Sequence, residues 1–539
     1  MARHLFVTRG DLTALYCDAW VLPTDREGRV TASWGPALAP LGLGRADADG
    51  GRLDEAACRD LVATGTAVLR SPSATCPGLV ACDTAVAHAD VDACARAAER
   101  ALARLEAVVG AADALPSRAL ELPRPRPLVG LPTVGVGAGG GRDVRGAVLA
   151  GQIAAIRRHL AANDDGPDVV LVCFAHEHYA AVQRARRAAN VGADFERALG
   201  SDLHDRVRAL AAQARTGRLV PFVGAGVSMG AGLPSWVGLI DELVEAAGME
   251  EDRAALDRID LRDRAALIQS RLGAGELDRF LLDRLSQATR VALQHQLLAS
   301  LPVHEAVSTN WDDLFERAWA QAGADPVAVL PLDGQTDAEH WIVKLHGTVR
   351  DGEIHDVVLT RDDYLRFGAE RNALAGIVQA LLLTRHMLFV GFGLSDETFH
   401  RIAHDVRQAL SGPSAMRADD AAYATSLSPS RRSITSELWR GQLDVVSTRR
   451  PDDGEGRAGT PLAARRLEIA LDAMGMLSVD PLGHLLDPTF DGALTDEEQA
   501  LALALRRFAR EAEPLLGHAG PAGEAVARWL GRMRPSAER

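Results

Sequence analysis

The chain has 539 residues, of which 47% are hydrophobic and 24% are charged, and its formal net charge at pH 7 is −14. This length allows roughly three or four domains of about 150 residues each, with the composition of an ordinary globular protein. The negative charge disfavours nucleic acid and anionic membranes as partners, no stretch approaches the ~20 apolar residues of a membrane span, and no signal peptide is visible, so we expect a cytoplasmic protein.

Residues 1–197 have the pattern of an α/β domain. Short apolar runs at 4–8 and 19–24 predict strands, and the stretch 90–112 has apolar positions at helical spacing. We therefore expect this region to fold as one unit.

The second half of this region alternates in the same way. The proline-rich stretch 117–127 predicts an exposed connection that enters a strand at Leu128 to Pro132. A glycine-rich loop at 135–146 then leads into a helix at about 144–162, and "DVVLVCF" at 168–174 predicts a buried strand.

Residues 198–450 begin with a predicted helix at 202–216 and then alternate apolar runs with helical patterns, which favours a parallel, Rossmann-like sheet built from βαβ units. The predicted strands lie in "RLVPFVG", "EAVSTN", "WIVKLHG", "HMLFVGFG", "AAYATS" and "LDVVS". The stretch 238–300 is helical throughout and predicts an inserted helical lobe. After a linker-like stretch at 449–460, the region 451–539 is predicted to be helical.

The stretch "VPFVGAGVSMGAGLPSW", from Val220 to Trp236, concentrates glycines directly after an apolar strand. Glycines allow a tight turn and let backbone N–H groups come close to a ligand. A helix follows, and its N-terminus favours an anion. This design suits the diphosphate of a dinucleotide at the carboxyl end of a strand, although a purely structural turn is the alternative.

The order of residues in this loop resembles the NAD-binding loop of the sirtuin family. The matching residues are Gly224, Ala225, Gly226, Ser228, Gly232, Leu233, Pro234 and Trp236. Val237 stands where the family often has arginine, which leaves the contacts on the substrate side open. Ser228 could instead serve only as a helix cap.

Three further segments resemble sirtuin motifs in the family's order. "STNWDDLFE" carries Thr309, where the family has glutamine, followed by Asn310 and Asp312. "VKLHG" places His346 at the position of the catalytic histidine. "LFVGFGLSD" resembles the strand and loop that contact the adenosine ribose, with Gly391, Gly393 and Ser395 as candidate NAD-binding residues.

The resemblance implies that NAD⁺ is the substrate and assigns roles to these residues. His346 is expected to act as a general base or ribose clamp, Asn310 to position water or the ribose, and Asp312 to orient nicotinamide. From the residues alone, Asn310 could cap the next helix and Asp312 could be a first-turn carboxylate stabilised by the helix dipole. Ser395 could belong to a turn.

Cysteine usage favours one branch of the family. All cysteines lie before residue 174, and none stands between His346 and Gly391, where deacylating sirtuins carry a zinc module held by four cysteines. We therefore expect no metal and predict an NAD⁺ hydrolase that releases nicotinamide and ADP-ribose or a cyclised product, resembling NAD-depleting effectors of anti-phage defence. The alternatives are an NAD-dependent deacylase or ADP-ribosyltransferase, and a non-catalytic NAD- or ADP-ribose-binding scaffold.

The first region resembles the opening of a macro domain. "RGDLT" places Asp11 at the carboxylate that holds adenine, although the family's asparagine segment is replaced by "LPTD". The later glycine loop resembles a phosphate loop, with Gly137, Gly139 and Gly140 as candidate ligand residues. The resemblance implies an ADP-ribose-type ligand that gates the hydrolase, and a macro-like scaffold without ligand is the alternative. We also expect a homo-oligomer and a phage-derived or operon-encoded trigger.

Overall fold

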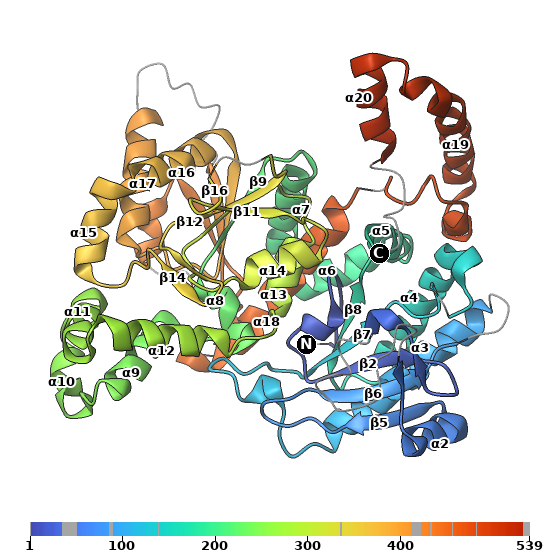
Figure 1. Ribbon diagram of the computed structural model, residues 1–539, viewed down its shortest axis with the longest axis horizontal. Coiled ribbons are helices and arrows are strands. Elements are labelled where there is room, and N and C mark those ends of the chain that lie inside the picture. Colours follow the sequence, from blue (N-terminus) through green and yellow to red (C-terminus); the bar gives the residue numbers. More distant parts are fainter. Residues whose placement is uncertain are drawn as a thin grey trace. The chain divides into compact units, whose positions relative to one another are not determined.

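The computed structural model describes residues 2–531 except 35–50, 86–89, 138, 335–336, 411–421, 432–433, 455 and 481. The chain forms two compact units (Figure 1). Unit 1 comprises Met1–Ala119, Arg126–Ala198 and Gly475–Arg539, and unit 2 comprises Leu120–Pro125 and Leu199–Met474. The last part of the predicted C-terminal region, 532–539, lies outside the described residues, and the three-domain division of the sequence stays a prediction.

Unit 1 contains a mostly parallel sheet with the strand order β1-β8-β7-β2-β6-β5. Among the described strands of this sheet, β5 alone runs antiparallel to its neighbour. The strands are β1 Leu5–Arg9, β2 Ala19–Thr24, β5 Thr66–Arg70, β6 Gly78–Asp83, β7 Leu128–Pro132 and β8 Asp168–Cys173. Their apolar side chains share one core with α3 Val91–Gly110, α4 Arg145–Ala162 and α5 His176–Ala188. The α/β pattern predicted for this region is confirmed.

The connection that enters β7 differs from its prediction. We expected an exposed segment, but Leu120 is buried and 122–127 is half-buried. The segment Leu120–Pro125 belongs to unit 2, where the carboxylate of Glu121 accepts hydrogen bonds from the backbone N–H and the hydroxyl of Ser235, at 2.7 and 2.8 Å. Arg124 forms an ion pair of 2.7 Å with Glu468. These polar contacts explain why a proline-rich stretch is held against the protein.

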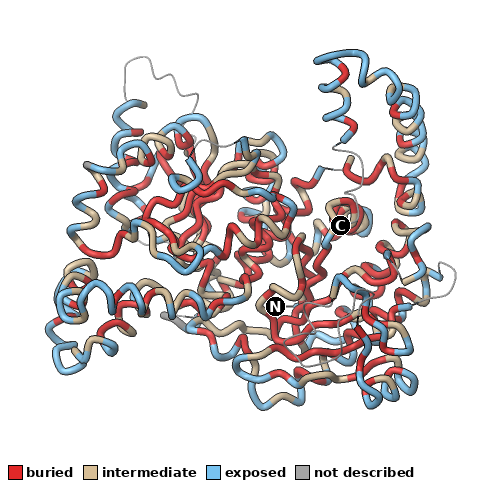
Figure 2. The backbone as a smooth tube through the Cα atoms, in the orientation of Figure 1, coloured by how far each residue is buried: buried red, intermediate tan, exposed pale blue. Residues whose placement is uncertain are grey.

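Unit 2 is built on a parallel sheet with the strand order β11-β12-β10-β9-β15-β16-β17. The strands are β9 Leu219–Val223, β10 Glu305–Ser308, β11 Val327–Leu330, β12 His340–Lys344, β15 His386–Val390, β16 Ala424–Ser428 and β17 Leu443–Ser447. The central strands β9, β15 and β16 are almost continuously buried, as expected of a parallel sheet that reads as apolar runs, and the edge strands β11 and β17 are partly half-buried (Figure 2). The predicted Rossmann-like sheet is confirmed.

The order of strands in unit 2 reverses at its centre. The chain leaves β9 toward β10 on one side and leaves β15 toward β16 on the other, although β9 and β15 are hydrogen-bonded neighbours. Such a topological switch point opens a crevice at the carboxyl ends of the two strands, where ligands of open α/β sheets bind. Both sirtuin-like glycine loops follow these two strands.

The inserted helical lobe predicted between β9 and β10 is present. It comprises α9 Trp236–Ala246, α10 Arg253–Leu256, α11 Leu261–Leu272, α12 Ala274–Ser286 and α13 Leu293–Ala299. Leu243, Ile268 and Leu281 belong to a separate core that α9, α11 and α12 share with Trp311 and Leu359. The lobe thus packs through its own apolar surface, which also contacts Trp311 in the loop after β10.

Helices dominate the C-terminal region, as predicted, with α18 Thr460–Ser478, α19 Asp496–Leu516 and α20 Gly520–Gly531. The stretch 449–460, which was predicted to be a flexible linker, is held by an ion pair between the buried carboxylate of Asp453 and Arg466 of α18. Of the helices described, none is long and apolar enough to cross a membrane.

The loops after β9 and β15 meet through glycine backbones, which gives a stability prediction. Gly391 has φ +67°, and a Cβ atom there would lie 2.5 Å from the backbone nitrogen of Val227. We expect Gly391→Ala to lower the free energy of unfolding of unit 2 by about 1–2 kcal/mol from the left-handed backbone alone, and further through the overlap.

Gly393→Ala is the matched control, because a Cβ atom at Gly393 meets its nearest neighbour at 3.8 Å. Thermal and denaturant unfolding of both variants would test this prediction. Equal stability of Gly391→Ala and the wild type would contradict the close approach of the two loops.

Candidate active site

Four sequence-predicted loops come together at one edge of the unit 2 sheet. They follow β12, β10, β9 and β15, which are consecutive neighbours in the sheet, and the carboxyl ends of parallel strands share one edge. His346 follows β12, Asn310 and Asp312 follow β10, the first glycine loop follows β9, and Gly391 to Ser395 follow β15. Sequence order had separated these residues by as many as 171 positions, from Gly224 to Ser395.

The first glycine loop packs backbone against backbone. The N–H of Gly224 donates to the carbonyl of Val390 at 3.0 Å, and the N–H of Gly226 donates to the carbonyl of Gly391 at 2.9 Å. A Cβ atom at Gly224 would lie 2.5 Å from the carbonyl oxygen of Gly391. The structural need for these glycines is therefore the approach of the β15 loop, and their predicted contact with a diphosphate stays a prediction.

Ser228 is the centre of a buried polar network. Its hydroxyl donates to Oδ2 of Asp312 at 2.9 Å and accepts a hydrogen bond from Nδ2 of Asn310 at 3.0 Å. All three side chains are buried. Ser228 thus fixes the two motif residues of the β10 loop relative to each other, and it does not cap a helix.

His295, at the start of α13, completes this network and was missed by the sequence analysis. Its Nδ1 accepts the backbone N–H of Ala292 at 3.0 Å, and its Nε2 lies 3.4 Å from Oγ of Ser228. Burial, with smaller effects from Arg317 and Lys344, lowers the pKa of His295 to about 3, so the ring is neutral and carries its proton on Nε2. No local motif marks this histidine, because its partner lies 67 residues away.

Asp312 also has support from the following helix, α14 Leu314–Gln321. Its Oδ1 accepts the backbone N–H of Leu314, the first residue of this helix, at 3.1 Å. Asp312 itself lies before the N-cap residue Asp313, so it is not the first-turn carboxylate of the alternative interpretation. Its backbone carbonyl accepts a 2.6 Å hydrogen bond from the ammonium group of Lys344, which pairs with Glu316 at 2.8 Å. Lys344 and Glu316 were not predicted as site residues. Together they hold the backbone of the loop after β10.

Asn310 does not cap α14, which was the alternative to its catalytic role. Its Nδ2 bonds Ser228, and its backbone N–H donates to the hydroxyl of Ser308 at 3.0 Å. Within the described residues, its buried Oδ1 has no hydrogen-bond partner. A buried amide oxygen without a partner is costly, and a ligand hydroxyl or a water molecule would satisfy it.

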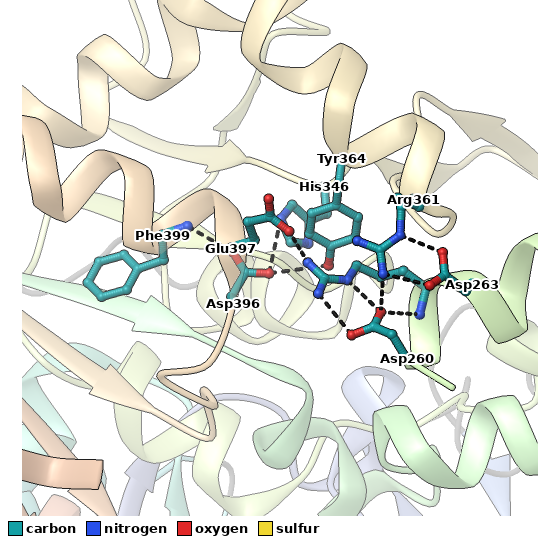
Figure 3. A network of polar contacts seen from close by, with 9 residues as sticks. Asp260, Asp263, His346, Arg361, Tyr364, Asp396, Glu397 and Phe399 are labelled. Atoms are coloured by element: carbon teal, nitrogen blue, oxygen red, sulfur yellow. Dashed lines mark hydrogen bonds and ion pairs between the residues drawn. The ribbon is translucent and has the colours of Figure 1, made fainter. Parts of the chain in front are cut away.

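His346 is buried among aromatic and charged side chains. Its ring meets the rings of Tyr364 and Phe367 edge to face, at centroid distances of 5.4 and 6.3 Å. Its Nε2 is 3.7 Å from Oδ2 of Asp396 and makes no hydrogen bond with any residue that the structure describes (Figure 3). Burial lowers the pKa of His346, Asp396 opposes this change, and Arg371 adds to it.

The remaining predicted residues of unit 2 belong to the loops that follow β9, β10 and β15. Trp236 is the first residue of α9 and packs edge to face on Trp311 at 5.5 Å. The backbone N–H of Thr309 donates to the carbonyl of Val223 at 3.3 Å, which joins the ends of β10 and β9. Gly393 and Ser395 are exposed, and Ala225 and Pro234 are half-buried. Their predicted contacts with NAD⁺ remain predictions.

The candidate ligand residues of unit 1 follow β1 and β7, which flank β8 in its sheet. The carboxylate of Asp11 accepts the backbone N–H and the hydroxyl of Thr13, both at 2.8 Å, and so caps a short 3₁₀ turn. Gly137 and Gly140 are exposed, and Gly139 packs against the backbone of Gly135. In the part of the chain that the structure describes, no group of three or more His, Cys, Asp or Glu side chains is placed to hold a metal ion.

Comparison with known proteins bears on unit 2. Residues 304–441 match the family model of the SIR2-like domain. This match begins just before β10 and includes the Asn310, His346 and Gly391 loops, so the sirtuin-like character predicted from the motifs is confirmed for this part of the chain. The macro-like character of unit 1 stays a prediction.

The relatives found by sequence comparison are named as NAD(+) hydrolases or as a defense-associated sirtuin. The chain is 29% identical over 201 residues to the NAD(+) hydrolase ThsA of Enterococcus faecium, and 27% identical over 197 residues to the NAD(+) hydrolase ThsA of Bacillus cereus. It is 25% identical over 215 residues to the defense-associated sirtuin 2 of Bacillus subtilis. These alignments cover 36%, 35% and 39% of this chain, and 41%, 40% and 21% of the relatives. The chain thus spans less than half the length of each.

The Ser228 network predicts a stability loss that is larger than that of an ordinary surface serine. Ser228→Ala would leave Asp312, Asn310 and His295 without a partner that each now contacts. We expect the free energy of unfolding to fall by about 1–3 kcal/mol, the usual cost of buried polar groups left unsatisfied.

Ser286→Ala serves as the control, because Ser286 is exposed and its hydroxyl bonds a carbonyl of its own helix. We expect its unfolding midpoint in urea to match the wild type. If both variants lose the same stability, the network does not hold the loops together.

Proposed function

We propose that unit 2 is an NAD⁺ hydrolase that cleaves the bond between nicotinamide and ribose with water as the nucleophile. The products are nicotinamide and ADP-ribose, or a cyclised form when an internal nucleophile replaces water. The observation that carries the proposal is a pair of buried polar atoms, Oδ1 of Asn310 and Nε2 of His346, at the switch point of a parallel sheet. Neither atom has a hydrogen-bond partner among the residues that the structure describes.

The geometry supports distinct roles for these residues. Water oxygen bonds to the anomeric carbon, the bond from that carbon to the ring nitrogen breaks, and the electron pair neutralises the positive charge of nicotinamide. The water proton passes to His346, which burial keeps neutral and ready to accept it. Oδ1 of Asn310 orients the water or a ribose hydroxyl. The carboxylate of Asp312, which accepts a hydrogen bond from Ser228, orients the amide group of nicotinamide.

Support for hydrolysis over protein deacylation comes from the segment between His346 and Gly391 and from the relatives' names. That segment forms the antiparallel pair β13 Thr348–Arg350 and β14 Glu353–His355, followed by α15 Arg361–Glu370 and α16 Asn372–Thr384. It contains no cysteine. Deacylase or ADP-ribosyltransferase activity and ligand binding without chemistry are the competing outcomes of the test below.

We also propose that the protein depletes NAD⁺ as an anti-phage defence effector, and that an ADP-ribose-type nucleotide bound to unit 1 gates this activity. The name of one relative, the defense-associated sirtuin 2 of Bacillus subtilis, supports the defence role. The glycine loop after β7 and Asp11 after β1 are the proposed ligand contacts. A hydrolase of a shared metabolite must be held inactive until a trigger arrives, and a homo-oligomer would spread one signal over several sites.

The hydrolase proposal is tested by following nicotinamide release from NAD⁺ by chromatography, with and without an acetyl-lysine peptide. We expect release without peptide and a decrease of roughly 10²-fold or more for Asn310→Ala and for His346→Ala, because each removes a group that acts on the reacting atoms.

Asn372→Ala and His404→Ala are controls of the same residue types on exposed helical positions of unit 2. They should retain the wild-type rate. Release that requires the peptide would favour a deacylase, and release unaffected by both site substitutions would overturn this assignment of the site.

The gating proposal predicts that ADP-ribose changes the rate of nicotinamide release through unit 1. Gly137→Val is the informative variant, because a Cβ atom at Gly137 meets nothing within 4 Å and the new side chain would occupy the loop's open face. ADP-ribose can also inhibit unit 2 as a product, and this inhibition is the same in the wild type and in Gly137→Val. The change in rate that ADP-ribose causes in the wild type but not in Gly137→Val is therefore the effect exerted through unit 1. Identical ADP-ribose responses of the two proteins would refute gating.

A further inference from the structure

Asp396 occupies a fixed position at the start of α17 Glu397–Leu410. Its Oδ1 accepts the backbone N–H of Phe399 at 2.9 Å, which is the contact of a helix-capping carboxylate. Phe399 is fully buried and belongs to the aromatic core of unit 2. The backbone of α17 therefore holds this carboxylate in place.

The second oxygen of Asp396 points toward the site (Figure 3). Oδ2 accepts the phenolic hydrogen of Tyr364 at 3.2 Å and lies 3.7 Å from Nε2 of His346. The last distance is too long for a hydrogen bond to the neutral ring, but it lies within the range of an ion pair with the protonated ring. Oδ2 thus faces Nε2 of His346, which has no hydrogen bond to the described residues.

The ring of Tyr364 contacts two further groups. It meets the ring of His346 edge to face, and the guanidinium of Arg262 lies 5.4 Å from its centre. Arg262 comes from α11 in the helical lobe and pairs with Asp260 at 2.8 Å and with Glu397. The phenol is therefore held where its hydroxyl meets Asp396.

We propose that Asp396, held by Tyr364 and by the N-terminus of α17, is a positioning residue that orients His346 and balances the charge it gains when it takes a proton from water. This proposal rests on the function proposed above. Asp396 acts through His346 and needs no contact with NAD⁺.

The charges around His346 determine the sign of the effect. Asp396 faces it from the start of α17, Tyr364 from α15, and Arg371 from the turn between α15 and α16. Burial and Arg371 lower the pKa of His346, and the Asp396 carboxylate raises it. Removing that negative charge should therefore lower the pKa further and weaken His346 as a base.

Asp396→Asn tests the proposal, because the amide oxygen can still accept the N–H of Phe399 while the charge is lost. A base acts in its neutral form, so activity falls as pH drops through its pKa. We expect the acidic limb of the pH–rate profile to move to lower pH by about one unit, and the plateau rate of nicotinamide release to fall roughly tenfold or more. Tyr364→Phe should move both in the same direction by less.

Asp405→Asn is the matched control, since it neutralises an exposed carboxylate of the same helix that accepts a hydrogen bond from Gln379. We expect its acidic limb to coincide with that of the wild type. If the acidic limb of the pH–rate profile does not move in Asp396→Asn, whether or not thermal stability falls, Asp396 serves only as a helix cap and the proposal is overturned.

A second measurement separates this proposal from the proposed function. Hydrogen exchange at the imidazole C2 position, followed by mass spectrometry, reports the pKa of His346 without any turnover. A lower midpoint in Asp396→Asn than in the wild type supports the positioning role even if nicotinamide is not released, in which case the hydrolase proposal alone fails. Equal midpoints overturn the positioning role even if the wild type is an active hydrolase.

Discussion

Two neighbouring strands, β9 and β15, continue their contact beyond the sheet, where the loops that follow them touch backbone to backbone at Gly224, Gly226 and Gly391. Side chains at these positions would hold the loops apart. Beneath the contact, Phe222 and Phe389 lie with ring centroids 4.8 Å apart, so the strands are fixed by packing as well as by hydrogen bonds. The two loops at the switch point meet as closely as they do because these glycines permit this approach.

The polar interior of the site depends on that geometry. Once the β9 loop is in place, Ser228 reaches Asp312, Asn310 and His295, which come from two other segments of the chain. A hydroxyl offers one hydrogen and two lone pairs, and all three are used here. Hydrogen bonds of this kind are strong in a region of low dielectric constant, and a missing member is expensive for the same reason. The network is therefore suited to holding catalytic groups in place.

The inserted lobe takes part in the site as well as in the fold. Arg262 of α11 reaches Glu397 at the start of α17 and covers Tyr364, which in turn contacts Asp396 and His346. The lobe is thus connected by charge and aromatic contact to the helix that begins at the β15 loop. Any change in the position of α11 would act on the charges around His346 through these contacts.

The sequence by itself determined the parallel sheet of unit 2, the helical lobe and the four motif-bearing loops, because apolar strand runs and glycine-rich turns are local patterns. It also identified Asn310, Asp312 and His346 by their resemblance to sirtuin motifs. It did not reveal His295, Lys344 or Asp396 as neighbours of these residues, and it suggested an exposed connection where Leu120 is buried. Only the tertiary structure decided those contacts, because hydrogen bonding and burial depend on distances between segments that are remote in the chain and leave no spacing in the sequence.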